Sequence, residues 1–225
     1  KLVSQVVDGD LREIQAGVDI AWISDDRFIV IDAFGGGDVQ GVAVVVPGRG
    51  VEKWLDMPIT DGVRVKTRIT RLVTLPDGGA VLVDWGDRHR FIFYDKDLSN
   101  PKEVLFGRYI AGINSFVRHP VSGDLYVAGF SDPDPKHPLP SDRNIVHHFT
   151  ALGEYINSAI LPVTAEVFSF GFIAVDPRNG TLWFSRVTPV EVIHLSTNLE
   201  ILDRFRGESE REDTPRAEAR DGWVG

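Results

Sequence analysis

Acidic side chains and a histidine gather in a proline-rich segment, residues 130–143, where they could bind a metal ion. Asp132, Asp134 and His137 lie there among four prolines. Carboxylate oxygens suit calcium, which takes about six to eight oxygen ligands, so the segment supplies only part of such a site. Long loops on a rigid scaffold often carry function. The segment is therefore a candidate ligand-binding loop, and a solvated surface loop is the alternative.

A short basic and aromatic segment offers a second kind of chemistry. Trp85, Arg88, His89 and Arg90 lie close together in a chain whose net charge is −9. Cationic side chains beside an aromatic ring suit the recognition of an acidic peptide or of a single strand of nucleic acid. A solvated loop is again the alternative interpretation.

A third set consists of charged and polar residues at matching places along the chain. Asp19 and Arg71 each lie five residues before a turn of similar sequence, and Asn114 lies one place off that register. If these side chains face a common channel, an acid and a base from neighbouring units meet there. Such a pair would form either a salt bridge or part of a polar ligand site.

Composition excludes several other chemistries. The chain has 225 residues and no cysteine, which excludes thiol catalysis, disulfides and cysteine–zinc sites. No Ser-His-Asp or paired-carboxylate motif is visible. The acidic balance argues against duplex nucleic acid, and no apolar run approaches the roughly 18 residues of a membrane-spanning helix. The lack of cysteine suits an extracytoplasmic location, although many cytosolic proteins also lack it.

Four turn-and-strand units align without a gap and must position these residues. Each is a turn rich in Asp, Gly, Asn and Pro, followed by a β-branched or aromatic run; the units begin at Ser24, Pro76, Pro120 and Pro177. Asp and Asn bond the backbone in such turns, and Gly supplies positive φ. Four-stranded sheets repeated every 40–50 residues or so are typical of β-propeller blades. The sequence therefore predicts an all-β fold, a β-propeller with four four-stranded blades.

The predicted blades extend to residue 206, covering about residues 14–57, 64–107, 112–162 and 165–206. Residues 1–8 resemble the last strand of a blade, so we expect a strand of a preceding blade or a closing strand. Residues 207–225 are a charged tail or the start of another blade. We expect the chain to be part of a larger, six-bladed ring, with a four-bladed ring as the alternative. An open array would expose blade edges, through which the chain could form a homo-oligomer.

Several other residues are interpreted as structural. Asp32 and Asp84 end equivalent strands, and we expect such an Asp to bind backbone N–H groups of its own loop. His147 and His148 are neighbours on a strand, so their side chains point to opposite faces, and we expect one in the core and one at the surface. The glycines at positions 35–37 lack the strand-before, helix-after context of a phosphate loop.

Residues 84–95, which follow an apolar strand at 81–83, resemble an NHL-type repeat. That unit runs from a strand through an Asp and a polar loop ending in Arg to an apolar strand, an Asp and a turn. Residues 171–183 resemble its opening half, whereas Ala128 and Ser185 stand where the family has its Asp. The resemblance implies a six-bladed propeller. Such propellers include scaffolds, RNA or protein binders, and metal-dependent lactonases and lyases, so no single function follows.

We expect a binding or scaffold module for a protein, a peptide or a small molecule at the channel face. The candidate ligand-binding residues are Asp19, Arg71, Trp85, Arg88, His89, Asn114, Asp132, Asp134 and His137. The alternative is a calcium-dependent hydrolase or lactonase. Metal-dependent lactonases of this fold use Glu, Asn and Asp in the channel, which would place calcium on Asp19 and Asn114. The first predicted strand has no clear Glu at its start, which counts against the enzyme, and no cofactor other than calcium is expected.

Overall fold

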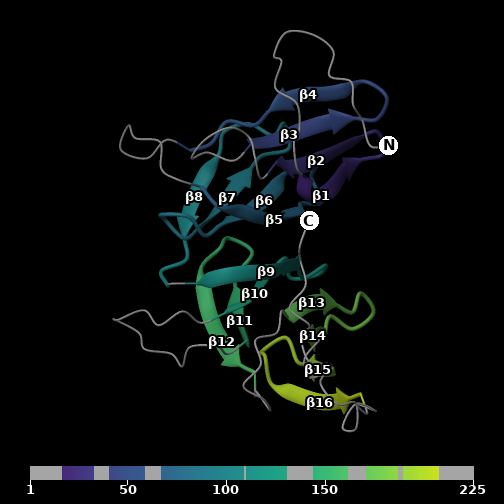
Figure 1. Cartoon of the computed structure of the whole chain (residues 1–225), viewed down its shortest axis with the longest axis vertical. Helices are drawn as coiled ribbons and strands as arrows, with labels where there is room; N and C mark the ends of the chain where they lie inside the picture. The colour runs from purple at the N-terminus through teal and green to yellow at the C-terminus, as the bar shows by residue number, and fades with distance from the viewer. Residues whose placement is uncertain are drawn as a thin grey trace, which may run out of the picture.

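The structure is a computed structural model that describes residues 17–32, 41–58, 67–108, 110–130, 144–161, 171–186 and 190–207. All regular structure in these residues is β-strand, and they contain no helix that could span a membrane. The strands form four antiparallel four-stranded sheets (Figure 1), which confirms the predicted all-β fold and its four blades. The predicted strand at residues 1–8 and the tail from residue 208 lie outside the described residues.

The strands of each sheet follow one another in chain order, from the innermost to the outermost. Blade 1 consists of β1 (Gly17–Ser24), β2 (Arg27–Asp32), β3 (Gly41–Val46) and β4 (Gly50–Trp54). Blade 2 consists of β5 (Ile69–Thr74), β6 (Ala80–Asp84), β7 (Arg90–Tyr94) and β8 (Lys102–Leu105). Blade 3 consists of β9 (Ala111–Arg118), β10 (Leu125–Phe130), β11 (Asn144–Phe149) and β12 (Tyr155–Ile160). Blade 4 consists of β13 (Gly171–Val175), β14 (Leu182–Arg186), β15 (Glu191–Leu195) and β16 (Ile201–Arg206).

The aligned turns of the sequence connect the first and second strands of each blade. In blade 2, the backbone N–H of Gly79 donates to Oδ1 of Asp77 at 3.1 Å. In blade 4, the backbone N–H of Thr181 donates to Oδ1 of Asn179 at 3.0 Å. These side-chain-to-backbone bonds are the ones that Asp and Asn form in tight turns. The turn residues of the repeat therefore fix where each blade folds back on itself.

Apolar residues from facing sheets form three buried clusters, one at each contact between successive blades. Ile31 and Leu82 belong to the cluster between blades 1 and 2, and Phe91 and Leu125 to the one between blades 2 and 3. The cluster between blades 3 and 4 includes Tyr126, Phe184 and Ile193. The inner blades 2 and 3 thus bury both faces against their neighbours, and blades 1 and 4 bury one face each in this way, as in other repeat architectures.

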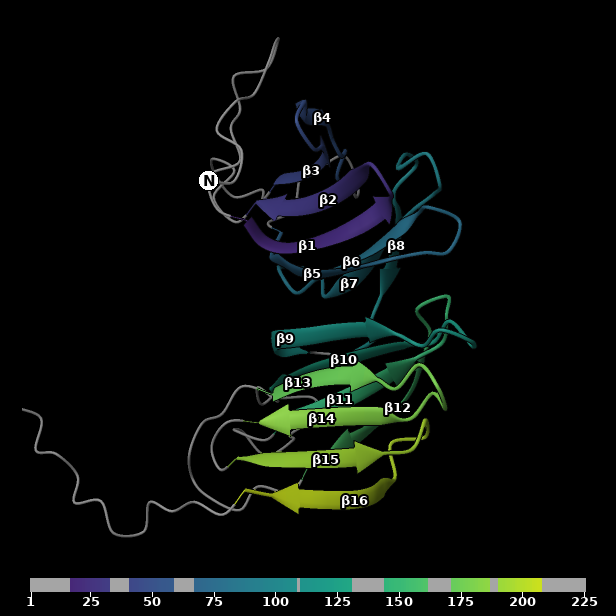
Figure 2. The same cartoon turned by 90° about the vertical axis from the view of Figure 1, so that its right-hand side faces the viewer.

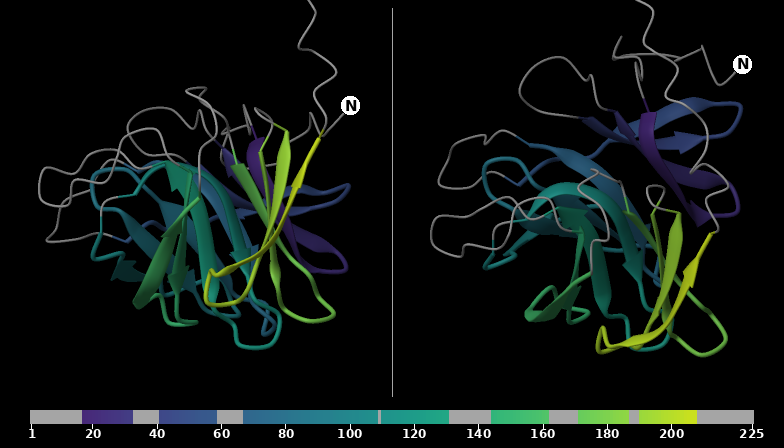
Figure 3. Two further views of the ribbon diagram at one scale, coloured as in Figure 1. Left: turned by 90° about the horizontal axis from the view of Figure 1, so that it is seen from below. Right: turned by 60° about the horizontal axis from the view of Figure 1, so that its bottom comes forward.

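The innermost strands β1, β5, β9 and β13 pack side by side in that order, and the outer strands extend away from them (Figure 1). Within the described residues β13 shows no packing of similar extent against β1, so the four blades form an open fan. The sheets of blades 1 and 4 both face the open side (Figure 2). Seen from below, blade 4 comes to the front and blade 1 lies behind it (Figure 3), as expected for the two ends of the fan.

A methyl group added at Gly180 tests the contact between blades 3 and 4. Gly180 has a φ of 76°, and a Cβ there would lie 2.2 Å from Nε2 of His119, a buried residue of blade 3. Gly48 is the matched control, because its φ is 78° and its added Cβ would meet nothing within 4 Å. We expect Gly180→Ala to lose about 1–3 kcal/mol more unfolding free energy than Gly48→Ala in urea titrations. Equal losses would show that His119 moves aside without cost.

Candidate functional site

Polar side chains on the innermost strands cross from each blade to the next. Oδ2 of Asp19 on β1 accepts the backbone N–H of Leu72 on β5 at 3.0 Å. Nε of Arg71 on β5 donates to the backbone carbonyl of Asn114 on β9 at 2.6 Å. The three candidates thus lie close together, Asp19 and Arg71 through their side chains and Asn114, which is one place off their register, through its backbone carbonyl. With Ser115 they form what we call the axial row.

Ser115 continues the row from blade 3 to blade 4. Its hydroxyl accepts the backbone N–H of Ile173 on β13 at 3.1 Å and lies 3.2 Å from the carbonyl oxygen of the same residue. Ser115 stands five residues before the aligned turn of its blade, the same place as Asp19 and Arg71. The sequence reasoning missed it, because a serine in a strand carries no distinctive signal by itself.

The axial row is half-buried and holds groups that are not fully paired. Burial raises the pKa of Asp19, opposed by the N–H of Leu72, the charge of Arg71 and the N–H of Ile20. Asn114 is buried, and its side-chain Nδ2 has no hydrogen-bond partner among the described residues. A buried unpaired donor of this kind costs about 1–3 kcal/mol. The side chain of Asn114 is thus the one member of the row whose buried donor lacks a partner among the described residues.

The geometry of Asp19 bears on the calcium interpretation. Its Oδ1 accepts the N–H of Ile20 at 3.1 Å, its Oδ2 accepts the N–H of Leu72, and Arg71 lies close enough to act on its charge. A neighbouring guanidinium repels a divalent cation. The described residues contain no group of three or more His, Asp or Glu side chains that could hold a metal ion. Asp132, Asp134 and His137 lie outside those residues, so calcium binding stays a prediction.

The positive charge of the loop between β6 and β7 and of Arg90, which follows it, is balanced by acidic side chains of the same blade. Nη2 of Arg88 lies 3.1 Å from Oε1 of Glu103 on β8. Arg90 is fully buried, with its Nε 2.9 Å from Oδ2 of Asp84 and a second ion pair to Glu103. Glu103 lies far along the sequence from the loop, so sequence reasoning did not include it. The positive charge that favoured an acidic ligand is therefore largely neutralised within blade 2.

Trp85 and His89 of the same loop pack inward. The guanidinium of Arg68 lies 4.7 Å from the Trp85 ring centroid, and the Trp85 ring packs on the cluster between blades 2 and 3. Nδ1 of His89 accepts the backbone N–H of Ile110 at a long 3.5 Å, and burial lowers the pKa of His89. The indole Nε1 of Trp85 is buried without a hydrogen-bond partner among the described residues. In this loop the indole N–H of Trp85 is thus a hydrogen-bond donor without a partner among the described residues.

Asp84 has the structural role that its position predicted. Its Oδ1 accepts the backbone N–H of Gly86 in its own loop at 2.9 Å and that of Arg68 at 2.7 Å. In blade 4 the equivalent pair has reversed charges, because Arg186 pairs in register with Glu191 as Asp84 does with Arg90. Hence Arg186, not Ser185, is the counterpart of Asp84. The turn between the first two strands of blade 4 lies between the paired residues Val175 and Leu182 and is one residue longer than the turn of blade 2 between Thr74 and Ala80. The gapless sequence alignment of the two blades is therefore one residue out of register after the turn.

The expectation for the two adjacent histidines was wrong in one respect. His147 and His148 are both buried, although one was expected at the surface. Blade 3 lies inside the fan and has both faces covered, so all of β11 is buried. His148 stacks on Tyr126 with ring centroids 4.4 Å apart and bonds Oδ2 of Asp124 at 3.1 Å. Burial, aided by the charge of Arg108, lowers the pKa of His147 to about 3.

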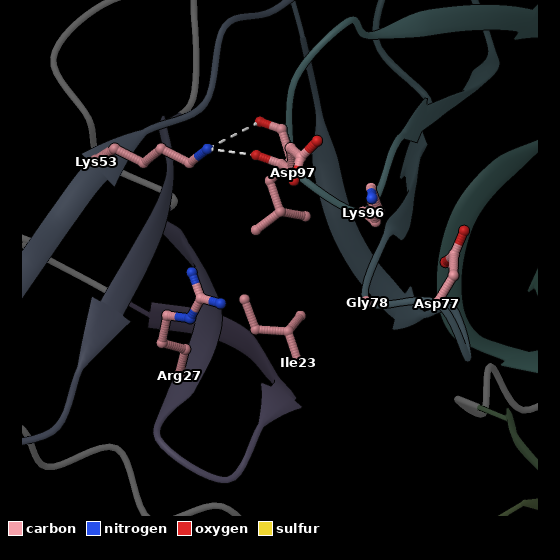
Figure 4. Close-up of a pocket in the computed structure, with 8 residues that line it drawn as sticks. Ile23, Arg27, Lys53, Asp77, Gly78, Lys96 and Asp97 are labelled. Atoms are coloured by element: carbon pink, nitrogen blue, oxygen red, sulfur yellow. Dashed lines mark hydrogen bonds between the residues drawn. The ribbon is translucent and has the colours of Figure 1, made fainter.

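A cavity of about 300 Å³ lies between blades 1 and 2, at the end where the turns lie (Figure 4). Nζ of Lys53 donates to the backbone carbonyls of Asp97 at 2.6 Å and Leu98 at 3.3 Å, which ties β4 to the turn after β7. The charged side chains of the lining are Arg27, Lys53, Lys96, Asp77 and Asp97. This surplus of positive charge suits a small anion. Sequence reasoning missed the cavity because its lining comes from separate turns and strand ends.

No protein-family model matches the chain, and no curated protein matches it. The resemblance to NHL repeats therefore stays a prediction, as does a count of six blades. Solved structures do match. A protein of unknown function from Bacteroides thetaiotaomicron VPI-5482 aligns with a TM-score of 0.57 and 11% identity, over 88% of this chain and 46% of that one.

Two further solved structures are similar to this chain. An auxiliary nutrient binding protein from Bacteroides thetaiotaomicron VPI-5482 aligns with a TM-score of 0.53 and 9% identity, over 84% of this chain and 41% of that one. A protein of unknown function from Bacteroides caccae aligns with a TM-score of 0.50 and 12% identity, over 81% of this chain and 58% of that one. The chain thus spans about half the length of these proteins. At such low identity the likeness shows the fold alone, which is that of a β-propeller.

The raised pKa of Asp19 predicts how stability depends on pH. Because folding raises this pKa above its ordinary value of 3.8, the folded state holds the proton more tightly than the unfolded state does. The wild type should therefore gain unfolding free energy relative to Asp19→Asn as the pH falls from neutral towards 3.8. Urea titrations of both proteins across that range measure the difference. A difference that stays constant, or shrinks as the pH falls, would contradict the prediction.

The buried pair in blade 2 predicts a large effect of a single substitution. Arg90→Leu leaves the buried Asp84 without its cationic partner, and we expect a loss of about 3–5 kcal/mol of unfolding free energy. Arg88→Leu is the control, because the Arg88 side chain is 28% exposed and should cost about 1 kcal/mol or less. Thermal and urea denaturation of both variants compares the two. Similar losses would mean that burial does not set the strength of these pairs.

Proposed function

We propose that this chain is a binding module of the β-propeller class that takes a ligand at the axial row. The observation that carries the proposal is the buried, unpaired Nδ2 of Asn114 on the strand to which Arg71 is bonded. A donor left unsatisfied in a native structure marks a place where an acceptor can be gained. The best ligand is therefore one that presents a carboxylate or a carbonyl oxygen to these donors.

The arrangement around Arg71 supports an acceptor-bearing ligand. Its Nε and Nη1 are held by the carbonyls of Asn114 and Thr70, each at 2.6 Å, which fixes the plane of the guanidinium. Within the described residues no bond engages its Nη2. A pre-positioned guanidinium binds carboxylates with geometric specificity.

The fold is consistent with this role without specifying it. Propellers present their loops and innermost strands around a common axis, and many bind ligands there. One solved structure of similar fold is described as an auxiliary nutrient binding protein. Unrelated functions share this fold, so the assignment depends on the axial row and not on the likeness.

Calorimetric titration tests the proposal with citrate, succinate and a short oligoglutamate peptide as probes. We expect at least one probe to bind, and Arg71→Gln and Asn114→Ala to weaken it about tenfold or more, the equivalent of about 1.4 kcal/mol. Arg49→Gln is the matched control, because Arg49 lies exposed on the turn between β3 and β4. Circular dichroism establishes that each variant is folded.

Two outcomes would reject the proposal. One is that none of the probes binds. The other is that Arg71→Gln and Asn114→Ala bind the probe as strongly as Arg49→Gln does.

Thermal melts with calcium and after chelation test the alternative of a metal-dependent enzyme. A saturating ion, at about 100 times its dissociation constant, would add roughly 2.7 kcal/mol and raise the midpoint by several degrees.

A further inference from the structure

Three arginines of blade 4 converge on one buried glutamate. Glu191 begins β15 and is fully buried, and its partners in register are Arg186 at the end of β14 and Arg206 at the end of β16. Arg204 lies two residues before Arg206 on the same strand, so its side chain points to the same face. We call these four residues the arginine cluster.

The arginine cluster lies on the face of blade 4 that packs on blade 3. Phe184 on β14 and Ile193 on β15 belong to the apolar cluster between these two blades. Arg186 and Glu191 continue the same two buried rows, at the strand ends away from the turn between β13 and β14. β16 is the outermost strand of the blade (Figure 2), so its arginines lie at the outer edge of the sheet.

The carboxylate of Glu191 holds all three guanidinium groups. Its Oε2 accepts Nη2 of Arg186, and its Oε1 accepts Nε of Arg204 at 2.9 Å, Nη2 of Arg204 at 2.5 Å and Nε of Arg206 at 3.3 Å. Burial alone would raise the pKa of Glu191, but the bonds and charges of the three arginines hold this pKa below its ordinary value. The carboxylate therefore stays charged and fixes the positions of the arginines.

One carboxylate cannot balance three guanidinium groups, so the arginine cluster carries a surplus of two positive charges. Arg186 is enough to neutralise Glu191, and the surplus lies with Arg204 and Arg206, which are not buried. Asp203 alternates to the opposite face of β16, and its Oδ1 accepts the backbone N–H of Arg204. It therefore does not pair with the guanidinium groups of the cluster.

Blade 2 shows a related network without a surplus. There Arg88 and Arg90 pair with Asp84 and Glu103, so two acids balance two bases. Crowding like charges costs free energy, and blade 2 shows that this place in a blade does not require it. The surplus in blade 4 is also local, because the whole chain has a net charge of −9.

The arginine cluster has donors left over as well as charge. The side chains of Arg204 and Arg206 are 28% and 55% exposed. Within the described residues Arg206 is bonded through its Nε alone, which leaves both of its terminal nitrogens for another acceptor. Nε of Arg186, whose side chain is 1% exposed, is buried without a hydrogen-bond partner in the same part of the chain. An acceptor group supplied by a ligand would meet these donors.

We propose that Arg204 and Arg206 bind the phosphate group of a phosphate monoester at the outer edge of blade 4. Such a group carries about −1.5 to −2 charges near neutral pH and three acceptor oxygens, which matches the surplus of two charges. Arginine binds phosphate oxygens through two parallel hydrogen bonds, with geometric specificity. Glu191 holds the guanidinium groups in place before the ligand arrives, which lowers the entropic cost of ordering them.

Calorimetric titration with phosphoserine and inorganic phosphate tests the proposal, with acetate as a singly charged comparison. We expect both phosphate probes to bind and acetate to bind about tenfold more weakly or less. Arg206→Gln should weaken both phosphate probes about tenfold or more, because it removes the most exposed guanidinium of the cluster. Arg178→Gln is the matched control, since it removes the same charge from an 85% exposed side chain in the turn at the other end of blade 4. It should leave the affinity unchanged.

Three results would overturn the proposal. Neither phosphate probe binds, or acetate binds as tightly as phosphate, or Arg206→Gln binds phosphate as tightly as Arg178→Gln does. Arg204→Gln replaces Arg206→Gln if circular dichroism shows that the latter is unfolded. Arg71→Gln, in the axial row, should bind the phosphate probes as the wild type does, so the arginine cluster and the proposed function fail separately.

Discussion

Each inner sheet of this chain has two largely apolar faces, and it buries them against the neighbouring sheets. The three clusters between blades follow from this constraint, as does the burial of all of β6 and β11 in the inner blades. The same constraint explains why the terminal blades keep large exposed side chains such as Trp22 and Phe172. The hydrophobic contact has no fixed direction, however, so it cannot by itself set how one blade lies on the next.

Directional bonds at the axis supply that orientation. Asp19, Arg71 and Ser115 each cross to the innermost strand of the next blade and bond its backbone. The three residues differ in charge and size but occupy one place in the repeat. A hydrogen bond to a backbone group needs a suitable donor or acceptor within reach, not a particular residue. This tolerance explains why the row shows no common motif and still serves one structural purpose.

Local patterns made much of the fold predictable, and long-range partners made the rest unpredictable. Turn residues such as Asp77 and Asn179 act within a few positions, so the sequence placed all four hairpins. The placement of Asp19 and Arg71 followed from the repeat alignment. Glu103 as the partner of Arg90, and the burial of both His147 and His148, depend on strands and blades that meet only after folding. The cavity beside Lys53 has the same origin, since its lining is drawn from two blades.

The buried charged side chains of blades 2 and 4 are matched by partners within their own blades, so they offer little free charge to a ligand. Asp84 pairs with Arg90 in blade 2, and Arg186 pairs with Glu191 at the same register position in blade 4. The acid and the base have exchanged strands, so this position carries one acid and one base in either order. Glu191 is shared by Arg186, Arg204 and Arg206, so its charge is already matched. Buried donors without partners among the described residues instead include Nε1 of Trp85 and Nδ2 of Asn114, on neighbouring blades 2 and 3. If an acceptor-bearing ligand binds as proposed, these two unpaired donors make the contact between blades 2 and 3 the region where it would be recognised.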